Sequence, residues 1–135
     1  MINSLSITTP RQGLHEITRE VAAVVADSAL QAGLCTLFIQ HTSASLIVQE
    51  NADPSAARDL EQWLSRLVAE NDPLYTHTSE GADDMPSHIK TALTATSVVV
   101  PVMEGQLALG SWQGIFLWEH RRAQMQRTVI VHLGV

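Results

Sequence analysis

Residues 112–118, WQGIFLW, place large apolar side chains on both faces of any strand that they form. The two tryptophans share one face with Phe116, whereas Ile115 and Leu117 share the other, because successive side chains of a strand point to opposite sides. A strand with one face toward water alternates apolar and polar residues, and this segment does not. It therefore predicts a strand covered on both faces, either by a layer of helices or by another subunit.

The order of the remaining elements predicts the fold class. Helical spacing of apolar residues indicates two long helices, one over 18–32 with Thr18 as its cap and Gly33 at its end, and one that follows the capping residue Asp53. Pro86 is expected to open a third, short helix. Strands are expected at 3–8 with a hairpin partner, at 34–40 and 46–50, on both sides of a turn at Glu104–Gly105, and over 127–135. A chain that ends in a run of strands favours an α+β fold with a mainly antiparallel sheet, here one domain over residues 1–135.

Charge and length exclude several classes of function. The chain has 135 residues and a net charge of -6, and its eight lysines and arginines form no basic cluster with interleaved aromatics. A nucleic-acid partner is therefore not expected. No apolar run approaches the roughly 18 residues of a membrane span, and no signal peptide is recognisable, so we expect a cytoplasmic protein without a membrane partner. Cys35 lies in the apolar run GLCTLFIQ, which favours a buried side chain over a nucleophile.

The segment HTSASLIVQENADP concentrates polar side chains at the ends of two expected strands. His41 closes the first strand, and Glu50 and Asn51 follow the second. Residues at such positions are held by rigid elements and often converge on a ligand. The alternative for any single histidine is a structural one, with its ring hydrogen-bonded to backbone. Asp59, on the expected second helix, fits either a site-facing carboxylate or an ordinary solvated helix face.

The segment YTHTSEGADDMPSHIK contains two histidines and several acids. His77 and His88 lie eleven residues apart with Asp84 between them, which is not the spacing of a known metal motif. Imidazole and carboxylate together suit zinc or manganese, or magnesium when a substrate phosphate is present. The alternative is an acid-rich solvated loop followed by a short helix. The segment alone favours neither.

A third polar position lies at the end of the apolar row around Leu117. Glu119 has the same parity as Ile115 and Leu117, so its carboxylate is expected to be buried. A buried carboxylate needs a partner, which would be an arginine, a histidine or a metal. The neighbours that offer such a partner are His120, Arg121 and Arg122.

Four segments of this chain, HTSASLIVQENADP, YTHTSEGADDMPSHIK, VPVMEGQLALGSWQGIFLWEHR and RTVIVHLGV, closely resemble the YjbQ family in sequence and in order. Members of that family are described as secondary thiamine-phosphate synthases. The resemblance implies an α+β homotrimer with a polar pocket near the subunit contacts. It also implies a secondary activity that joins a hydroxymethylpyrimidine pyrophosphate to a thiazole phosphate and releases pyrophosphate. Ala82 and Ser87 are mild departures from the family pattern.

Roles for individual residues follow from the resemblance. A divalent metal, magnesium or zinc, would be held by His41, His77 and His88, with Asp84 or Glu119. The catalytic set would comprise His41, Glu50, Asn51, Asp59, Asp84 and Glu119, and the small phosphorylated substrate would be bound by Thr42, Ser43, Trp112, Gln113 and Arg122. Two other functions stay open, namely a metal- or small-ligand-binding protein without a synthase role and a metal-dependent phosphoester hydrolase.

Overall fold

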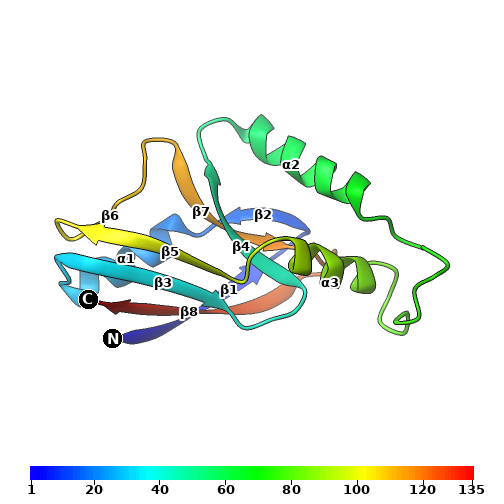
Figure 1. Ribbon diagram of the computed structural model, residues 1–135, viewed down its shortest axis with the longest axis horizontal. Coiled ribbons are helices and arrows are strands. Elements are labelled where there is room, and N and C mark those ends of the chain that lie inside the picture. The colour runs from blue at the N-terminus through cyan, green and yellow to red at the C-terminus, as the bar shows by residue number, and fades with distance from the viewer.

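Two antiparallel sheets form the framework of the computed structural model, which describes residues 1–135 (Figure 1). The larger sheet has the strand order β1-β8-β3-β5-β6 and the smaller one the order β2-β7-β4, so the predicted α+β class is confirmed. The strands are β1 (Ile2–Thr9), β2 (Gly13–Glu16), β3 (Ala32–Ile39), β4 (Ala44–Glu50), β5 (Ser97–Met103), β6 (Gln106–Leu107), β7 (Gln113–Glu119) and β8 (Met125–Gly134). The helices are α1 (Thr18–Ser28), α2 (Pro54–Leu67) and α3 (Asp84–Leu93).

The main core lies between the inner faces of the two sheets and α1. Val21 and Val25 of α1 pack there with Leu37 of β3 and with Ile115 and Leu117 of β7, all of them almost completely buried. Burial of apolar side chains at roughly 25 cal/mol per Å² is the main favourable term in folding. The main core therefore covers the inner face of the strand that was predicted around residue 115.

A second, smaller core covers the other face of the same strand. Phe116 and Trp118 pack there with Leu14 of β2, Leu64 of α2 and Val68 at the end of that helix. Of the two predicted coverings, a layer of helices therefore accounts for these two aromatic rings. Trp112 lies before the first residue of β7 and is 69% exposed.

The helix ends differ from the sequence prediction in two places. α1 ends at Ser28, and Ala29 takes the left-handed conformation with φ 59°, whereas Gly33 belongs to β3. Gly33 is needed there because a Cβ on it would come within 2.3 Å of the carbonyl oxygen of Gly134. Thr18 does not cap α1 either, since its hydroxyl donates to Glu16 and accepts from the backbone of β7.

The other two helices begin near the predicted positions. Asp53 caps α2 as predicted, because its Oδ1 accepts a hydrogen bond from the backbone N–H of Ser55 at 2.9 Å. α3 begins at Asp84, two residues before Pro86. No helix of the chain is both long and apolar enough to cross a membrane.

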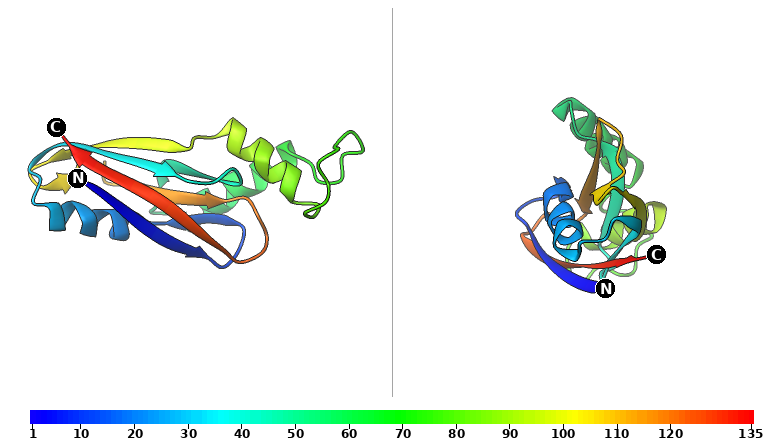
Figure 2. Two further views of the ribbon diagram at one scale, coloured as in Figure 1. Left: turned by 90° about the horizontal axis from the view of Figure 1, so that it is seen from below. Right: turned by 90° about the vertical axis from the view of Figure 1, so that its left-hand side faces the viewer.

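The long connection between α2 and α3 positions the polar segment that contains His77. It extends beyond the sheets at the end of the molecule opposite the two termini, and then returns to the start of α3 (Figures 1 and 2). The turn between β3 and β4 reaches the same region, as the hydrogen bond from the His88 ring to the Thr42 carbonyl demonstrates. The connection before α3 and the turn between β3 and β4, which are distant in sequence, therefore meet beside α3.

Candidate metal site

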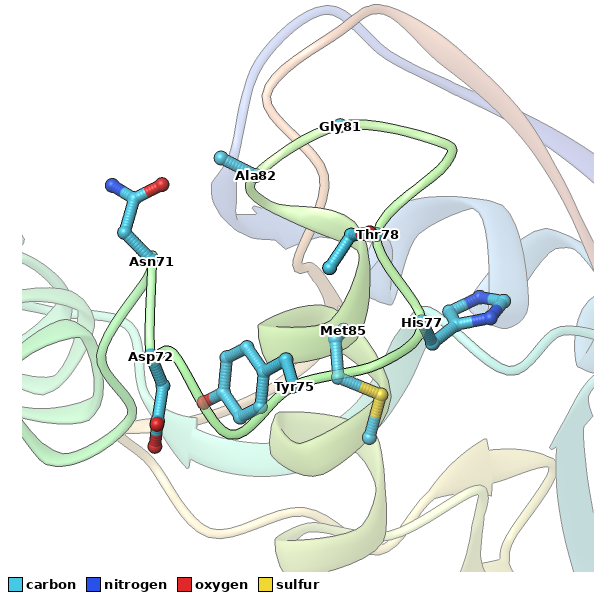
Figure 3. Close-up of a pocket in the computed structure, with 8 residues that line it drawn as sticks. All are labelled: Asn71, Asp72, Tyr75, His77, Thr78, Gly81, Ala82 and Met85. Atoms are coloured by element: carbon cyan, nitrogen blue, oxygen red, sulfur yellow. The ribbon is translucent and has the colours of Figure 1, made fainter.

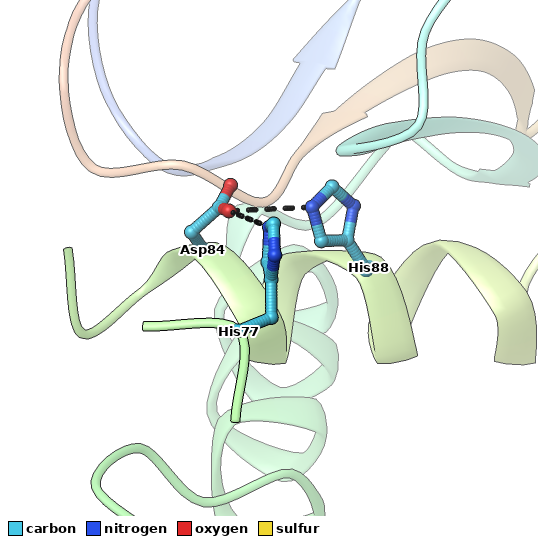
Figure 4. Close-up of side chains that lie close together, drawn as sticks. All are labelled: His77, Asp84 and His88. Atoms are coloured by element: carbon cyan, nitrogen blue, oxygen red, sulfur yellow. Dashed lines mark ion pairs between the residues drawn. The ribbon is translucent and has the colours of Figure 1, made fainter. Parts of the chain in front are cut away.

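Asp84, at the start of α3, is a buried carboxylate with one uncommitted oxygen. Its side chain is 2% exposed, and Oδ2 receives no hydrogen bond. Two imidazole nitrogens lie beside that oxygen, Nε2 of His77 at 2.8 Å and Nε2 of His88 at 3.3 Å (Figure 4). Although both nitrogens are close, neither meets Oδ2 in hydrogen-bonding geometry. Three groups that can donate electron pairs thus converge on one point.

The orientation of His88 is fixed by a backbone carbonyl. Asp84 and His88 are four residues apart, so they lie on the same side of α3. Nδ1 of His88 lies 2.9 Å from the carbonyl oxygen of Thr42, and a carbonyl can only accept, so Nδ1 carries the proton. The lone pair of a neutral His88 is therefore on Nε2, the nitrogen that faces Asp84. An outer hydrogen bond of this kind is typical of metal-binding histidines.

The other oxygen of Asp84 is held by Arg121. Nη1 of Arg121 donates to Oδ1 at 2.8 Å, and Nε donates to Asp83 at 3.1 Å. Burial lowers the pKa of this guanidinium, but the hydrogen bond and charge of Asp83 outweigh that effect and raise it. The guanidinium therefore stays charged and directs Oδ2 toward the two histidines.

These donor atoms suit a divalent transition metal. The ligand atoms of His77, Asp84 and His88 all lie within 4.8 Å of one another. Zinc binds histidine nitrogen and carboxylate oxygen at about 2.0–2.2 Å, which puts neighbouring ligands about 3.3–3.5 Å apart in a tetrahedral arrangement. Two imidazoles favour zinc, manganese or iron over magnesium, which prefers oxygen ligands. A site with three protein ligands also leaves a position for water or substrate.

His41, which was expected as a third metal-binding histidine, lies near this group but is not one of its three members. Its Nδ1 accepts from the backbone N–H of Ser43 at 3.2 Å and lies 2.9 Å from the Ser43 hydroxyl. Burial, followed by the charge of Arg127, lowers the pKa of His41, so its ring is neutral near pH 7. Because Nδ1 accepts a hydrogen bond, the proton is on Nε2, which leaves a donor rather than a metal ligand.

The carboxylate of Glu119 is not available to the candidate site, because it forms an ion pair with Arg127. Both side chains are completely buried, and Arg127 donates from Nε to Oε1 at 2.7 Å and from Nη2 to Oε2. Thr9 donates to Oε1 at 2.6 Å and the backbone N–H of Arg121 donates to Oε2 at 3.0 Å. Burial raises the pKa of Glu119, but these hydrogen bonds outweigh it and lower the pKa. The partner is thus Arg127 of β8 rather than the adjacent residues that the sequence suggested.

The remaining predicted residues fall into two groups. Thr42 and Ser43 lie beside the candidate ligands, where Ser43 is buried and its hydroxyl accepts from Arg127 at 2.8 Å. A second group lies at the opposite end of the β4–β7 pair, where Glu50 is opposite Gln113. Seven-residue strands separate the two ends by about 20 Å. The predicted residues that the structure does not bring to the candidate ligands are Glu50, Asn51, Trp112 and Gln113 at that far end, Asp59 on the exposed side of α2, and Arg122, which pairs with Glu70.

Two hollows open on either side of the candidate ligands. One, of about 210 Å³, is lined by His77, Tyr75 and Met85 among others (Figure 3). The other is a wider depression of about 440 Å³ that is lined by His41 and His88 together with Thr91 of α3 and threonines that follow it. The ligand group therefore lies where two ligands can approach from different sides.

Comparison with known proteins places the chain in a family. A model described as UPF0047 protein YjbQ-like matches residues 3–134. The chain belongs to the UPF0047, or YjbQ-like, family. A UPF0047 protein of Synechocystis is 52% identical over 130 residues, which cover 96% of this chain and 88% of that protein.

Solved structures of relatives share the UPF0047 fold. A conserved hypothetical protein of Thermus thermophilus has a TM-score of 0.87 at 36% identity, and the match covers 98% of this chain and 99% of that one. A YjbQ/UPF0047 family protein of Clostridium acetobutylicum has a TM-score of 0.85 at 31% identity, with 99% of each chain covered. The resemblance to the YjbQ family is therefore confirmed, whereas the names of these relatives state no reaction.

Two residues that shape the candidate site are not assigned to it by the sequence. Arg121 orients Asp84 through a hydrogen bond, and Arg127 forms an ion pair with Glu119. The sequence suggests Arg121 as a partner for Glu119 two positions away, or as a phosphate contact, and not as a partner of Asp84. The acidic pair at 83 and 84, opposite an Arg-Arg pair at 121 and 122, is the one available signal for its actual contact.

Proposed function

We propose that this protein is a divalent-metal enzyme that joins two small phosphorylated substrates with release of pyrophosphate, as in thiamine-phosphate synthesis. The observation that carries the proposal is the uncommitted Oδ2 of Asp84 facing the Nε2 atoms of His77 and His88. A bound metal ion, with zinc favoured by the two imidazoles, would neutralise the negative charge that develops on a departing pyrophosphate.

The neighbouring side chains are suited to binding and proton transfer. His41, neutral and with its proton on Nε2, faces the same depression as His88 and can donate a hydrogen bond to a phosphate oxygen. Arg121 and the Thr42 carbonyl keep Asp84 and His88 in place, so little reorganisation is needed when a substrate binds. These contacts support a site that is organised before the substrate arrives.

The two hollows support a reaction with two substrates. The one of about 210 Å³ has room for a single ring beside Tyr75 and Met85, and it is smaller than the roughly 300–1,000 Å³ of pockets that enclose a drug-sized ligand. The second substrate would occupy the depression beside His41 and His88. The reacting atoms would then meet next to the candidate ligands.

We also propose that the chain assembles as a homotrimer. Large apolar side chains on the outer face of the five-stranded sheet are about half exposed or more, among them Leu34, Phe38 and Val99. Such a contiguous apolar face favours subunit contact. Light scattering of the purified protein measures this directly, and a monomer at all concentrations contradicts it.

Metal analysis combined with turnover tests the proposed enzyme. We expect about one divalent ion per chain and turnover of the two substrates that EDTA abolishes. Asp84→Asn should lose metal affinity by more than the roughly 10–100-fold typical of outer partners, together with turnover. Glu80→Gln is the matched control, because it removes one carboxylate from an exposed position of the same loop. Full turnover in metal-free protein contradicts the proposal, and bound metal without turnover assigns the chain to metal or small-ligand binding.

A metal-dependent phosphoester hydrolase is a second candidate. It is favoured by the exposure of His77, whose side chain is 51% exposed and leaves the site accessible to water. Such an enzyme would release inorganic phosphate from simple esters such as p-nitrophenyl phosphate in the same metal-loaded protein. A lack of phosphate release from these esters excludes it.

A further inference from the structure

His41 is connected to the interior of the protein through the side chain of Ser43. Ser43 is 1% exposed, and its Oγ lies 2.9 Å from Nδ1 of His41. The backbone N–H of Ser43 donates to the same nitrogen at 3.2 Å, so Nδ1 is an acceptor. Two groups of one residue therefore meet the same edge of the imidazole, and the hydroxyl makes the shorter contact.

Arg127 determines the direction of the Ser43 hydroxyl. Nη2 of Arg127 donates to Oγ of Ser43 at 2.8 Å and to its carbonyl oxygen at 3.4 Å. A hydroxyl has one hydrogen, and an arginine can only donate, so that hydrogen does not point to the guanidinium. The other partner of Oγ is Nδ1 of His41. The Ser43 hydroxyl is thus a donor to His41, and the proton of a neutral ring is on Nε2.

The guanidinium of Arg127 makes this contact although its own hydrogen bonding stays incomplete. The side chain is completely buried, and Nη1 has no partner within the protein. The ion pair with Glu119 uses Nε and Nη2 and is complete without Ser43. Because a buried N–H without a partner is unfavourable, the placement of this arginine needs an explanation beyond the ion pair. Its contact with Ser43 offers one.

The ring of His41 also lines the wide depression that His88 and several threonines share. A nitrogen that is fixed as a donor at the wall of this depression suits a phosphate oxygen. Functional histidines are commonly kept in one tautomer by a hydrogen bond to the opposite ring nitrogen, and that bond comes from a residue that does not itself touch the substrate. Ser43 stands in this relation to His41.

We propose that Ser43 and Arg127 are positioning residues that hold His41 with its proton on Nε2, ready to donate to a phosphate oxygen of the substrate. The identity of that substrate rests on the proposed function, whereas the hydrogen bonds can be tested without turnover. Glu119 in turn fixes Arg127. The buried ion pair therefore acts on the site through a chain of hydrogen bonds and contributes no atom to a ligand.

Nitrogen NMR of the histidine rings in metal-free protein tests these hydrogen bonds. The signals of His41 are assigned by their loss in His41→Gln, and they should show a proton on Nε2 and an acceptor at Nδ1. Ser43→Ala removes the hydroxyl and keeps the backbone N–H, so the Nδ1 signal should move toward that of a nitrogen without a strong donor. A proton on Nδ1 in the unsubstituted protein, or an unchanged Nδ1 signal in Ser43→Ala, overturns the proposal.

Ser45→Ala is the matched control for this measurement. It also removes a completely buried hydroxyl, two positions further along the chain, but that hydroxyl contacts the ring of His120. The Nδ1 signal of His41 should therefore stay in place. A shift of this signal as large as that in Ser43→Ala would mean that loss of any buried hydroxyl disturbs the ring, and it would overturn the specific role of Ser43.

A double-mutant cycle on turnover tests whether Ser43 acts through His41. Ser43→Ala should lower turnover about tenfold, as the loss of one hydrogen bond can, and should leave zinc affinity unchanged. In the His41→Gln background the same change should have no further effect, because the ring that it positions is gone. Equal losses in the two backgrounds overturn the positioning role. Absence of turnover in the unsubstituted zinc-loaded protein contradicts the proposed function instead, and the NMR result then decides the positioning.

The part of Arg127 is tested in the double variant Glu119→Leu with Arg127→Met, which leaves no unpaired buried charge. Without the guanidinium the Ser43 hydroxyl can turn to another acceptor, so the Nδ1 signal of His41 should move in the same direction as in Ser43→Ala. An unchanged signal in this variant overturns the role of Arg127. Ser43→Ala keeps the ion pair and decides the proposal if the double variant does not fold.

Discussion

Glu119 and Asp84 are both almost completely buried, but their oxygens are used differently. Each oxygen of Glu119 accepts hydrogen bonds from two donors, supplied by Arg127, Thr9 and the backbone of Arg121. Asp84 uses only Oδ1, toward Arg121, and leaves Oδ2 to the two histidines. From the sequence alone, both carboxylates have the same expected role as site residues.

The comparison separates a structural carboxylate from one that can bind a ligand. A buried carboxylate whose lone pairs are all occupied stabilises the fold and has nothing left for a substrate. A buried carboxylate with a free oxygen is unfavourable in the absence of a ligand, and a protein retains it when the ligand compensates. Glu119 should therefore affect stability and Asp84 should affect metal binding.

The largest expected effect is the loss of stability in Glu119→Ala. This change leaves the completely buried guanidinium of Arg127 without its partner, which costs about 3–5 kcal/mol. Denaturant unfolding of metal-free protein measures the change. Zinc affinity of the fraction that remains folded should not change, because Glu119 lies outside the ligand group.

The double variant Glu119→Leu with Arg127→Met is the control for this prediction. Removing both charges together leaves no unpaired ion, so most of the lost stability should return. If Glu119→Ala instead weakens zinc binding while the fold stays stable, Glu119 belongs to the site and the distinction between the two carboxylates is wrong.

The next effect concerns pH and His120, which follows Glu119 in the chain. Its pKa is about 3 in the folded protein and about 6.5 in the unfolded chain, so only the unfolded chain takes up a proton as the pH falls below 6.5. Stability should therefore be constant above that pH and fall by about 2 kcal/mol between pH 7 and pH 5. Denaturant unfolding of metal-free protein at these two values measures the loss.

His120→Gln should remove most of this pH dependence. His41, whose pKa is also lowered, contributes in the same direction and remains in the variant. The range above pH 5 is chosen because the carboxylates begin to take up protons below it. Identical slopes for the two proteins contradict the buried neutral state of His120.

Local chemistry explains why much of the fold was predictable. Asp53 and Pro54 mark the start of α2 through the cap and the fixed backbone angle, and both act within one turn of the chain. The end of α1 was not predictable in this way, because Gly33 is required by the contact with Gly134 of a strand a hundred residues away. Local signals predicted the elements, and tertiary contacts set their ends.

The same division applies to the candidate site. His77, Asp84 and His88 are candidates because they share one segment, and the four-residue spacing of the last two places them on one side of a helix. The choice between Asp84 and Glu119 as the carboxylate beside the histidines depends on the ion pair of Glu119 with Arg127 of β8, which no local pattern describes. The sequence predicts an ordinary solvated side chain for Lys90, because no local pattern indicates that α2 covers it.

The smallest of these effects tests how Asp84 is held. Arg121→Met removes the donor to Oδ1, so the carboxylate should turn more freely and zinc affinity should fall about tenfold, or about 1.4 kcal/mol, at the lower end of the range for outer partners. Competition with a chromophoric chelator measures the affinity. Arg122→Met is the matched control, because its guanidinium pairs with the partly exposed Glu70 and not with Asp84. Equal zinc affinities in the two variants would mean that Oδ2 is directed by the histidines alone, and the contrast with Glu119 would then rest on the free oxygen rather than on the arginine behind it.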